Sequence, residues 1–157
     1  MEPAQARGIA NGWYGAAEEI GAPKDLFNAL ARELSVLLSA DAQTGIGFQD
    51  GEVLVLAIDG ERFVCIGVHA PAEEEESVTF ARSLSLSGAP SLDVSAQRKE
   101  ENDSISLVRT WTLRVGNGEA IKVSTRVPVT QSFAVDRGGE ALMMALARKL
   151  GWPIPGD

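Results

Sequence analysis

The stretch GFQDGEVLVLAIDGERFVCIGV, residues 47–68, decides the fold of this chain. Two Asp-Gly pairs, Asp50-Gly51 and Asp59-Gly60, bracket the seven mostly apolar residues 52–58. Asp-Gly supplies the two positive φ angles that a two-residue hairpin turn requires. We therefore predict a three-stranded antiparallel meander with a tight turn at each pair.

Strand alternation separates two faces of this meander. With two residues in each turn, Val53 is expected to lie opposite Phe48 on one side and Ile66 on the other. Val55 is likewise expected to lie opposite Ile46 and Val64. One face then carries Ile46, Phe48, Val53, Val55, Val64, Ile66 and Val68, and the other carries Leu54, Leu56, Ile58, Phe63 and Cys65. Because both faces are apolar, both need a cover.

The bulkier face, with Leu54 and Phe63, is better suited to packing under helices. We therefore expect the opposite face to be the less covered one, and to bind a partner. The side chains predicted to do so are Phe48, Val53, Val55, Val64 and Ile66.

Three segments have helical periodicity. Residues 4–20 show an apolar stripe, but their three glycines each cost about 1 kcal/mol relative to alanine. In residues 24–40, leucines recur at helical spacing, and Pro23 and Asp25 suit the N-terminal end of a helix. The third helix is expected over 139–150, with Gly151 ending it.

Residues 104–127 predict a second hairpin. A loop of three residues, Asn117–Glu119, is favoured over a two-residue loop because it places Leu113 opposite Val123 and Trp111 opposite Thr125. Gly118 is expected to have a positive φ. Residues 72–87 leave two alternatives: alternation of apolar residues with Ser and Thr favours a strand, whereas the glutamates 73–76 suit a helix N-terminus.

These elements predict an α+β fold, in which the meander and a C-terminal hairpin form an antiparallel sheet packed with N-terminal and C-terminal helices. The 157 residues, 45% of them hydrophobic, fit a single domain over 1–157 that buries roughly 70% of its unfolded surface. Within it, 23–152 form the core, and the helix in 1–22 is weakly specified.

Composition narrows the function classes. The net charge of −8 opposes nucleic-acid binding, and the longest apolar runs are far shorter than a membrane helix needs. Residues 1–21 lack the pattern of a signal peptide. Cys65 is the only cysteine, so it forms no internal disulfide. Together these features lead us to expect a cytoplasmic protein that binds neither nucleic acid nor membrane.

The sequence contains few residues in patterns typical of catalytic, cofactor-binding or metal-binding sites. The only histidine, His69, precedes Glu73–Glu76, but consecutive carboxylates project in different directions, so a charged corner is favoured over a metal site. Neither a GxSxG nor a phosphate-loop motif is present, and the neighbours of Cys65 are apolar. We predict no catalytic, cofactor-binding or metal-binding residues, no cofactor, and no enzymatic activity.

The order of the elements resembles the class I type III secretion chaperones of the Tir-chaperone type. The stretches that carry the resemblance lie within residues 23–152: DLFNALARELSVLL, FQDGEVLVLAIDGERFVCIGV, SLDVSAQRKEENDSISLVRTW and RVPVTQSFAVDRGGEALMMALARKLGW. The chain departs from that family in the strand alternation of 72–87, where the family has a central helix, and in the helix at 4–20 and the strand at 119–127.

The resemblance implies a homodimer that holds an unfolded segment of a secreted effector protein on apolar sheet and helix surfaces. A disordered client needs a long wrapped interface, because it loses conformational entropy on binding. Two other functions stay open: a small-molecule-binding or carrier domain with a cavity between sheet and helices, and an acidic inhibitor or immunity-type protein that covers a basic partner.

Overall fold

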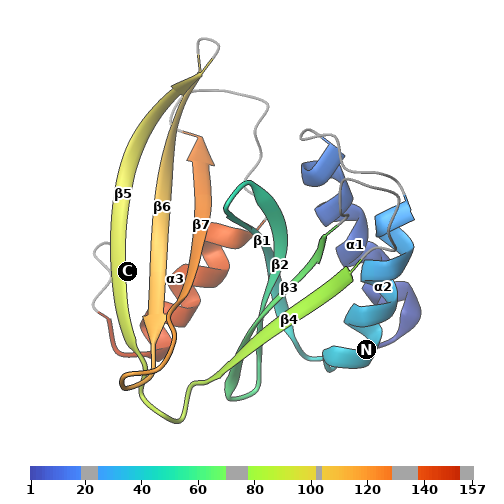
Figure 1. The fold of residues 1–157 in the computed structure, drawn as a ribbon, viewed down its shortest axis with the longest axis horizontal. Helices are drawn as coiled ribbons and strands as arrows, with labels where there is room; N and C mark the ends of the chain where they lie inside the picture. The colour runs from blue at the N-terminus through green and yellow to red at the C-terminus, as the bar shows by residue number, and fades with distance from the viewer. Residues whose placement is uncertain (19–24, 70–77, 102–103, 129–137, 153–157) are drawn as a thin grey trace.

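The computed structural model describes residues 1–18, 25–69, 78–101, 104–128 and 138–152 (Figure 1). Its helices are α1 (Pro3–Glu18), α2 (Asp25–Leu37) and α3 (Gly139–Lys149). Its strands are β1 (Gln43–Gln49), β2 (Glu52–Asp59), β3 (Arg62–His69), β4 (Val78–Ser85), β5 (Ser91–Glu101), β6 (Ser104–Arg114) and β7 (Ile121–Pro128). The three predicted helices, the meander and the second hairpin are all present.

The strands form one antiparallel sheet in the order β4-β3-β2-β1-β7-β6-β5. Its two halves, β1–β4 and β5–β7, meet where β1 pairs with β7 at Phe48 and Ser124. Figure 1 shows α1 and α2 beside β1–β4, whereas α3 contacts β1, β2 and β7. The predicted α+β class, with N-terminal and C-terminal helices packed on an antiparallel sheet, is confirmed.

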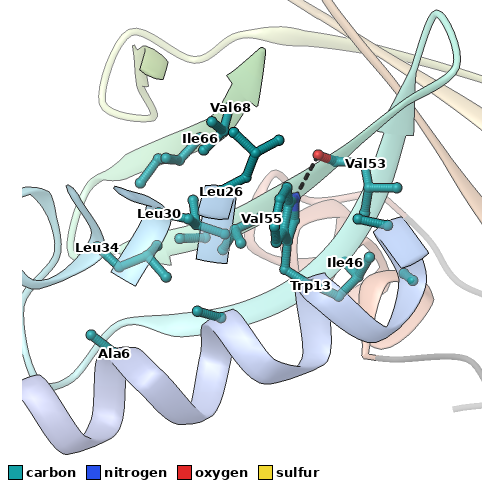
Figure 2. Packing of buried hydrophobic residues seen from close by; sticks show 14 of the residues in the cluster. Ala6, Trp13, Leu26, Leu30, Leu34, Ile46, Val53, Val55, Ile66 and Val68 are labelled. Atoms are coloured by element: carbon teal, nitrogen blue, oxygen red, sulfur yellow. Dashed lines mark hydrogen bonds between the residues drawn. The ribbon is translucent and has the colours of Figure 1, made fainter. Parts of the chain in front are cut away.

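Two hydrophobic cores cover the two faces of the meander. In the first core, α1 and α2 pack on the face that carries Val55 and Ile66 (Figure 2). In the second core, α3 packs on the face that carries Leu56 and Phe63, together with the inner faces of β6 and β7. The expectation that the Val55 face is the less covered one is therefore wrong.

The Val55 face is covered because α1, which the sequence specifies weakly, packs on it. Its inward face carries small side chains, such as Ala6 and Ala10, which let the helix approach the sheet closely. Its one large buried side chain, Trp13, donates a hydrogen bond from Nε1 to the backbone oxygen of Val53 at 2.8 Å. Packing on the sheet thus stabilises a helix that propensity alone would leave marginal.

The first turn of the meander has the predicted register, with Phe48 opposite Val53 and positive φ at both Asp50 and Gly51. The second register is shifted by two residues, so that Val55 pairs with Ile66 instead of Val64. Asp59 belongs to the strand, because its carboxylate accepts hydrogen bonds from the backbone N–H of Ser39 at 2.9 Å and from Arg62 at 3.1 Å. A shift of two residues leaves every side chain on its predicted face.

The hairpin of β6 and β7 is also shifted by two residues, with Leu113 opposite Ile121 and Trp111 opposite Val123. The positive φ occurs at Gly116, with a value of 56°, and not at Gly118. Between Val78 and Ser85 the chain forms a strand, as the alternation predicted, and not the helix that the family resemblance implied. Residues 72–77 of that prediction lie outside the described residues.

Candidate functional site

The five predicted partner-binding side chains share one face, but four of them are enclosed by α1 and α2. Val53, Val55, Val64 and Ile66 are each at most 3% exposed. Phe48 is half-buried at the junction of the half-sheets, where the guanidinium carbon of Arg126 lies 5.9 Å from its ring centroid. Partner binding through these residues stays a prediction, and it would require the two helices to move away.

The predicted charged corner is described only in part. His69 ends β3 and pairs with Val78, whereas Glu73–Glu76 lie outside the described residues. Within the part of the chain that the structure describes, no group of three or more His, Cys, Asp and Glu side chains could hold a metal ion.

Cys65 lies in β3 among the side chains of the second core. Burial raises the pKa of its thiol to about 12, against a smaller opposite effect of Arg82. The thiolate form, which a nucleophile or a metal ligand needs, is therefore disfavoured at neutral pH. This position agrees with the apolar neighbours of Cys65 in the sequence.

A buried polar chain, which the sequence analysis missed, links α3 to the sheet. Trp111 Nε1 donates to Thr125 Oγ1 at 2.8 Å, and Thr125 Oγ1 donates to Glu140 Oε2 at 2.6 Å. The other carboxylate oxygen of Glu140 is paired with Arg109. Arg109 lies opposite Thr125 in the observed register, so these contacts also explain why the hairpin is shifted from the predicted pairing. The chain of hydrogen bonds fixes α3 in place and leaves its groups engaged with one another.

Two open hollows flank β1. The first, about 340 Å³, lies between α1 and β1 and is lined by Gln5, Gly8, Ile9, Gly12, Thr44, Gly45 and Ile46. The second, about 410 Å³, lies between the start of β1 and the end of α3 and includes Asp41 and Lys149. Both are open to solvent, whereas a carrier function calls for a site that encloses most of its ligand.

The outer edge of β4 carries fewer charged residues than the edge of β5 at the other end of the sheet. No described strand pairs with it, and it carries one charged residue, Arg82, in eight. Val78 at its start is 55% exposed, and Ala81 and Ser83 are exposed. The other edge strand, β5, has five charged residues in its eleven: Asp93, Arg98, Lys99, Glu100 and Glu101. Charge on an edge strand opposes pairing with another chain, so β4 is the less protected edge.

None of the helices that the structure describes is long and apolar enough to cross a membrane. Comparison with known proteins adds no assignment: no family model matches this chain, no curated protein matches it, and no solved structure matches it.

Proposed function

We propose that this chain is a non-enzymatic chaperone or adaptor that binds an extended, non-globular segment of a secreted protein. The observation that carries the proposal is the open, sparsely charged edge of β4. A client strand that pairs with β4 would gain main-chain hydrogen bonds, and pockets for alternate side chains would add specificity. The resemblance to type III secretion chaperones supports the same function. A cytoplasmic location is part of the proposal, because such a chaperone binds its client before secretion.

Main-chain pairing suits a non-globular client. An extended segment has free N–H and C=O groups, and an edge strand offers the complementary groups without needing a particular sequence. The side of β4 shared with α2 carries Ala81 and Ser83, which are small enough to leave room for client side chains. Eight residues of strand are enough for a client segment of similar length, about 26 Å when extended.

A homodimer is part of this proposal, as the family resemblance implies. Pairing of β4 with β4 of a second copy would be isologous, since antiparallel strands related by a two-fold axis present the same edge to each other. The second copy is thus the competing occupant of the same edge. Light scattering over a range of protein concentrations measures the dimer directly.

A photo-reactive amino acid placed at residue 81 tests the occupant of the edge. The matched control carries it at residue 96, since Ala81 and Ala96 are both exposed alanines in edge strands, one in β4 and one in β5. After irradiation in the source cell, we expect an adduct with an exported protein at position 81 and none at position 96. Mass spectrometry of the adduct identifies the client and the cross-linked segment.

Charge on the edge provides the second arm of the test. Ser83→Lys, made with the photo-reactive residue kept at position 81, should remove the adduct with the client, because a bound strand would bury the ammonium group, whereas Ala96→Lys should leave that adduct unchanged. Adducts made only with a second copy of this chain would show that β4 serves the dimer, and would contradict client binding at this edge. Equal client adducts at positions 81 and 96 would also contradict client binding at the edge of β4.

A further inference from the structure

The sheet face that carries the first core continues onto β5–β7, where none of the described helices covers it. The continuity follows from the pairing, because Phe48 of the first core lies opposite Ser124, and Ser124 lies opposite Thr110. Helices α1 and α2 contact β1–β4 and stop short of β5–β7 (Figure 1). We call the β5–β7 part of this face the outer face.

The register gives the composition of the outer face, because residues paired across antiparallel strands point to the same side. Its successive rows are Lys122, Thr112 and Asp93; then Ser124, Thr110 and Ser95; then Arg126, Val108 and Gln97. Arg114 and Lys99 extend it at its two ends. The hydroxyl groups of Thr110 and Ser124 lie 3.3 Å apart, in agreement with this assignment.

The charge of the outer face is opposite to that of the whole chain. By its register the outer face carries four of the chain's 14 basic residues and two acidic residues, Asp93 and Glu101, although the net charge of the chain is −8. Lys99, Arg114 and Lys122 are exposed, and Arg126 is half-buried beside Phe48. At physiological ionic strength, charges more than about 8 Å away are largely screened, so a ligand on this face meets mainly the local positive charge.

Two kinds of polyanion could respond to this charge. A nucleic acid carries closely spaced phosphates well beyond the face, where the rest of the acidic chain would repel it. The described side chains of the outer face also include no aromatic ring on which bases could stack, and the neighbouring Phe48 of β1 is half-buried. Rows of hydroxyl and amide groups beside basic side chains suit carboxylates and a peptide backbone, which favours an acidic polypeptide.

We propose that the outer face of β5–β7 is a docking surface for an acidic segment of a partner protein. Lys99, Lys122 and Arg126 would pair with its carboxylates, and Thr110 and Thr112 would donate hydrogen bonds to it. This surface is separate from the edge of β4, which lies at the opposite end of the sheet. The inference therefore does not rest on the proposed client binding.

A fluorescein-labelled oligoglutamate peptide of about ten residues, long enough to follow one strand of this face, is the probe. Its binding to the full chain is measured by fluorescence anisotropy at about 20 mM and about 300 mM NaCl. We expect binding at low salt that weakens as salt increases. The double substitution Lys99→Glu and Lys122→Glu should weaken it about tenfold, since two attractive contacts become repulsive.

The matched control is Arg7→Glu with Arg32→Glu, which changes the net charge equally on the exposed surfaces of α1 and α2. It should change the affinity less than twofold, because the two sites lie outside the outer face. The variant with Lys99→Gln and Lys122→Gln should bind oligoglutamate with an affinity between that of wild type and that of the charge reversal. Urea unfolding of each variant verifies that the exposed substitutions leave the fold intact.

The proposal is overturned if the control weakens oligoglutamate binding as much as the charge reversal does, because binding would then follow net charge alone. Absence of binding at low salt overturns it as well. Tighter binding of a single-stranded oligonucleotide of equal length, with the same dependence on Lys99 and Lys122, would identify the face as a nucleic-acid site instead of a protein site.

Discussion

Replacing Thr125 with valine tests the buried polar chain that holds α3 on the sheet. Valine has nearly the same shape, but it removes the hydroxyl that accepts from Trp111 and donates to Glu140. Trp111 and Thr125 are each 1% exposed, and Glu140 is 9% exposed, so water does not readily replace the lost partner. The indole N–H and one carboxylate oxygen would therefore be left without this bond in the core.

A buried polar group left without a partner costs about 1–3 kcal/mol. Two such groups, offset in part by the added methyl group of valine and by the remaining contact of Glu140 with Arg109, give an expected loss of about 3 kcal/mol in the free energy of unfolding. For a chain of this size the loss corresponds to a decrease in Tm of about 6–12 °C. Urea unfolding followed by circular dichroism measures the first quantity, and thermal unfolding the second.

Thr110→Val is the matched control, because Thr110 belongs to the same sheet but lies half-buried on the outer face. It should change the stability by no more than about 0.5 kcal/mol. Thr125→Ser keeps the hydroxyl and should recover most of the loss. If Thr125→Val costs less than about 1 kcal/mol, or no more than Thr110→Val, the polar chain does not fix α3 and the reasoning is refuted.

The other predictions concern the two cores and two titratable groups. Val55→Asp and Leu56→Asp should both abolish the folded circular dichroism spectrum, since each side chain is 0% exposed and either change buries an unpaired carboxylate. A folded Val55→Asp variant would instead support partner binding on the Val55 face of the meander. Cys65 should react with a disulfide reagent far more slowly in the folded chain than in urea at pH 8, because burial raises its pKa to about 12; equal rates would contradict its position in the second core. Hydrogen bonds from Ser39 lower the pKa of Asp59 below its usual 3.8, so its ionised form stabilises the fold above that pH and the gain is lost as the pH falls further. The difference in urea stability between wild type and Asp59→Asn should therefore shrink from pH 7 to pH 3, and a constant difference would exclude this linkage.

Alternation of apolar residues determined which side chains share a face, without any knowledge of the tertiary structure. The period of a strand is two, so both shifts, at Asp59 and in the hairpin of β6 and β7, moved the pairing by two residues and kept every face as predicted. The helices α2 and α3 were also predicted from local signals, since apolar spacing and end signals such as Gly151, with a φ of 81°, depend on neighbouring residues, whereas α1 depends on its packing against the sheet.

The registers themselves depended on contacts between segments far apart in the chain. Asp59 is held in its strand by Ser39, and the hairpin is held by Glu140, which is 15 residues from Thr125. Turn propensities differ little in energy between neighbouring positions, so one or two buried hydrogen bonds decide among them. No local pattern contains that information.

The candidate sites depended on tertiary structure most of all. Alternation within residues 72–87 favoured a strand over a helix, but only the order of the sheet makes β4 an edge strand with no described strand on its outer side. Likewise, Lys99, Lys122 and Arg126 come from separate strands, and the pairing of β5, β6 and β7 brings them onto one face. Tertiary packing also decided which helices cover each face of the meander. Both faces are apolar, so only close packing distinguishes the small residues of α1 from the leucines of α3.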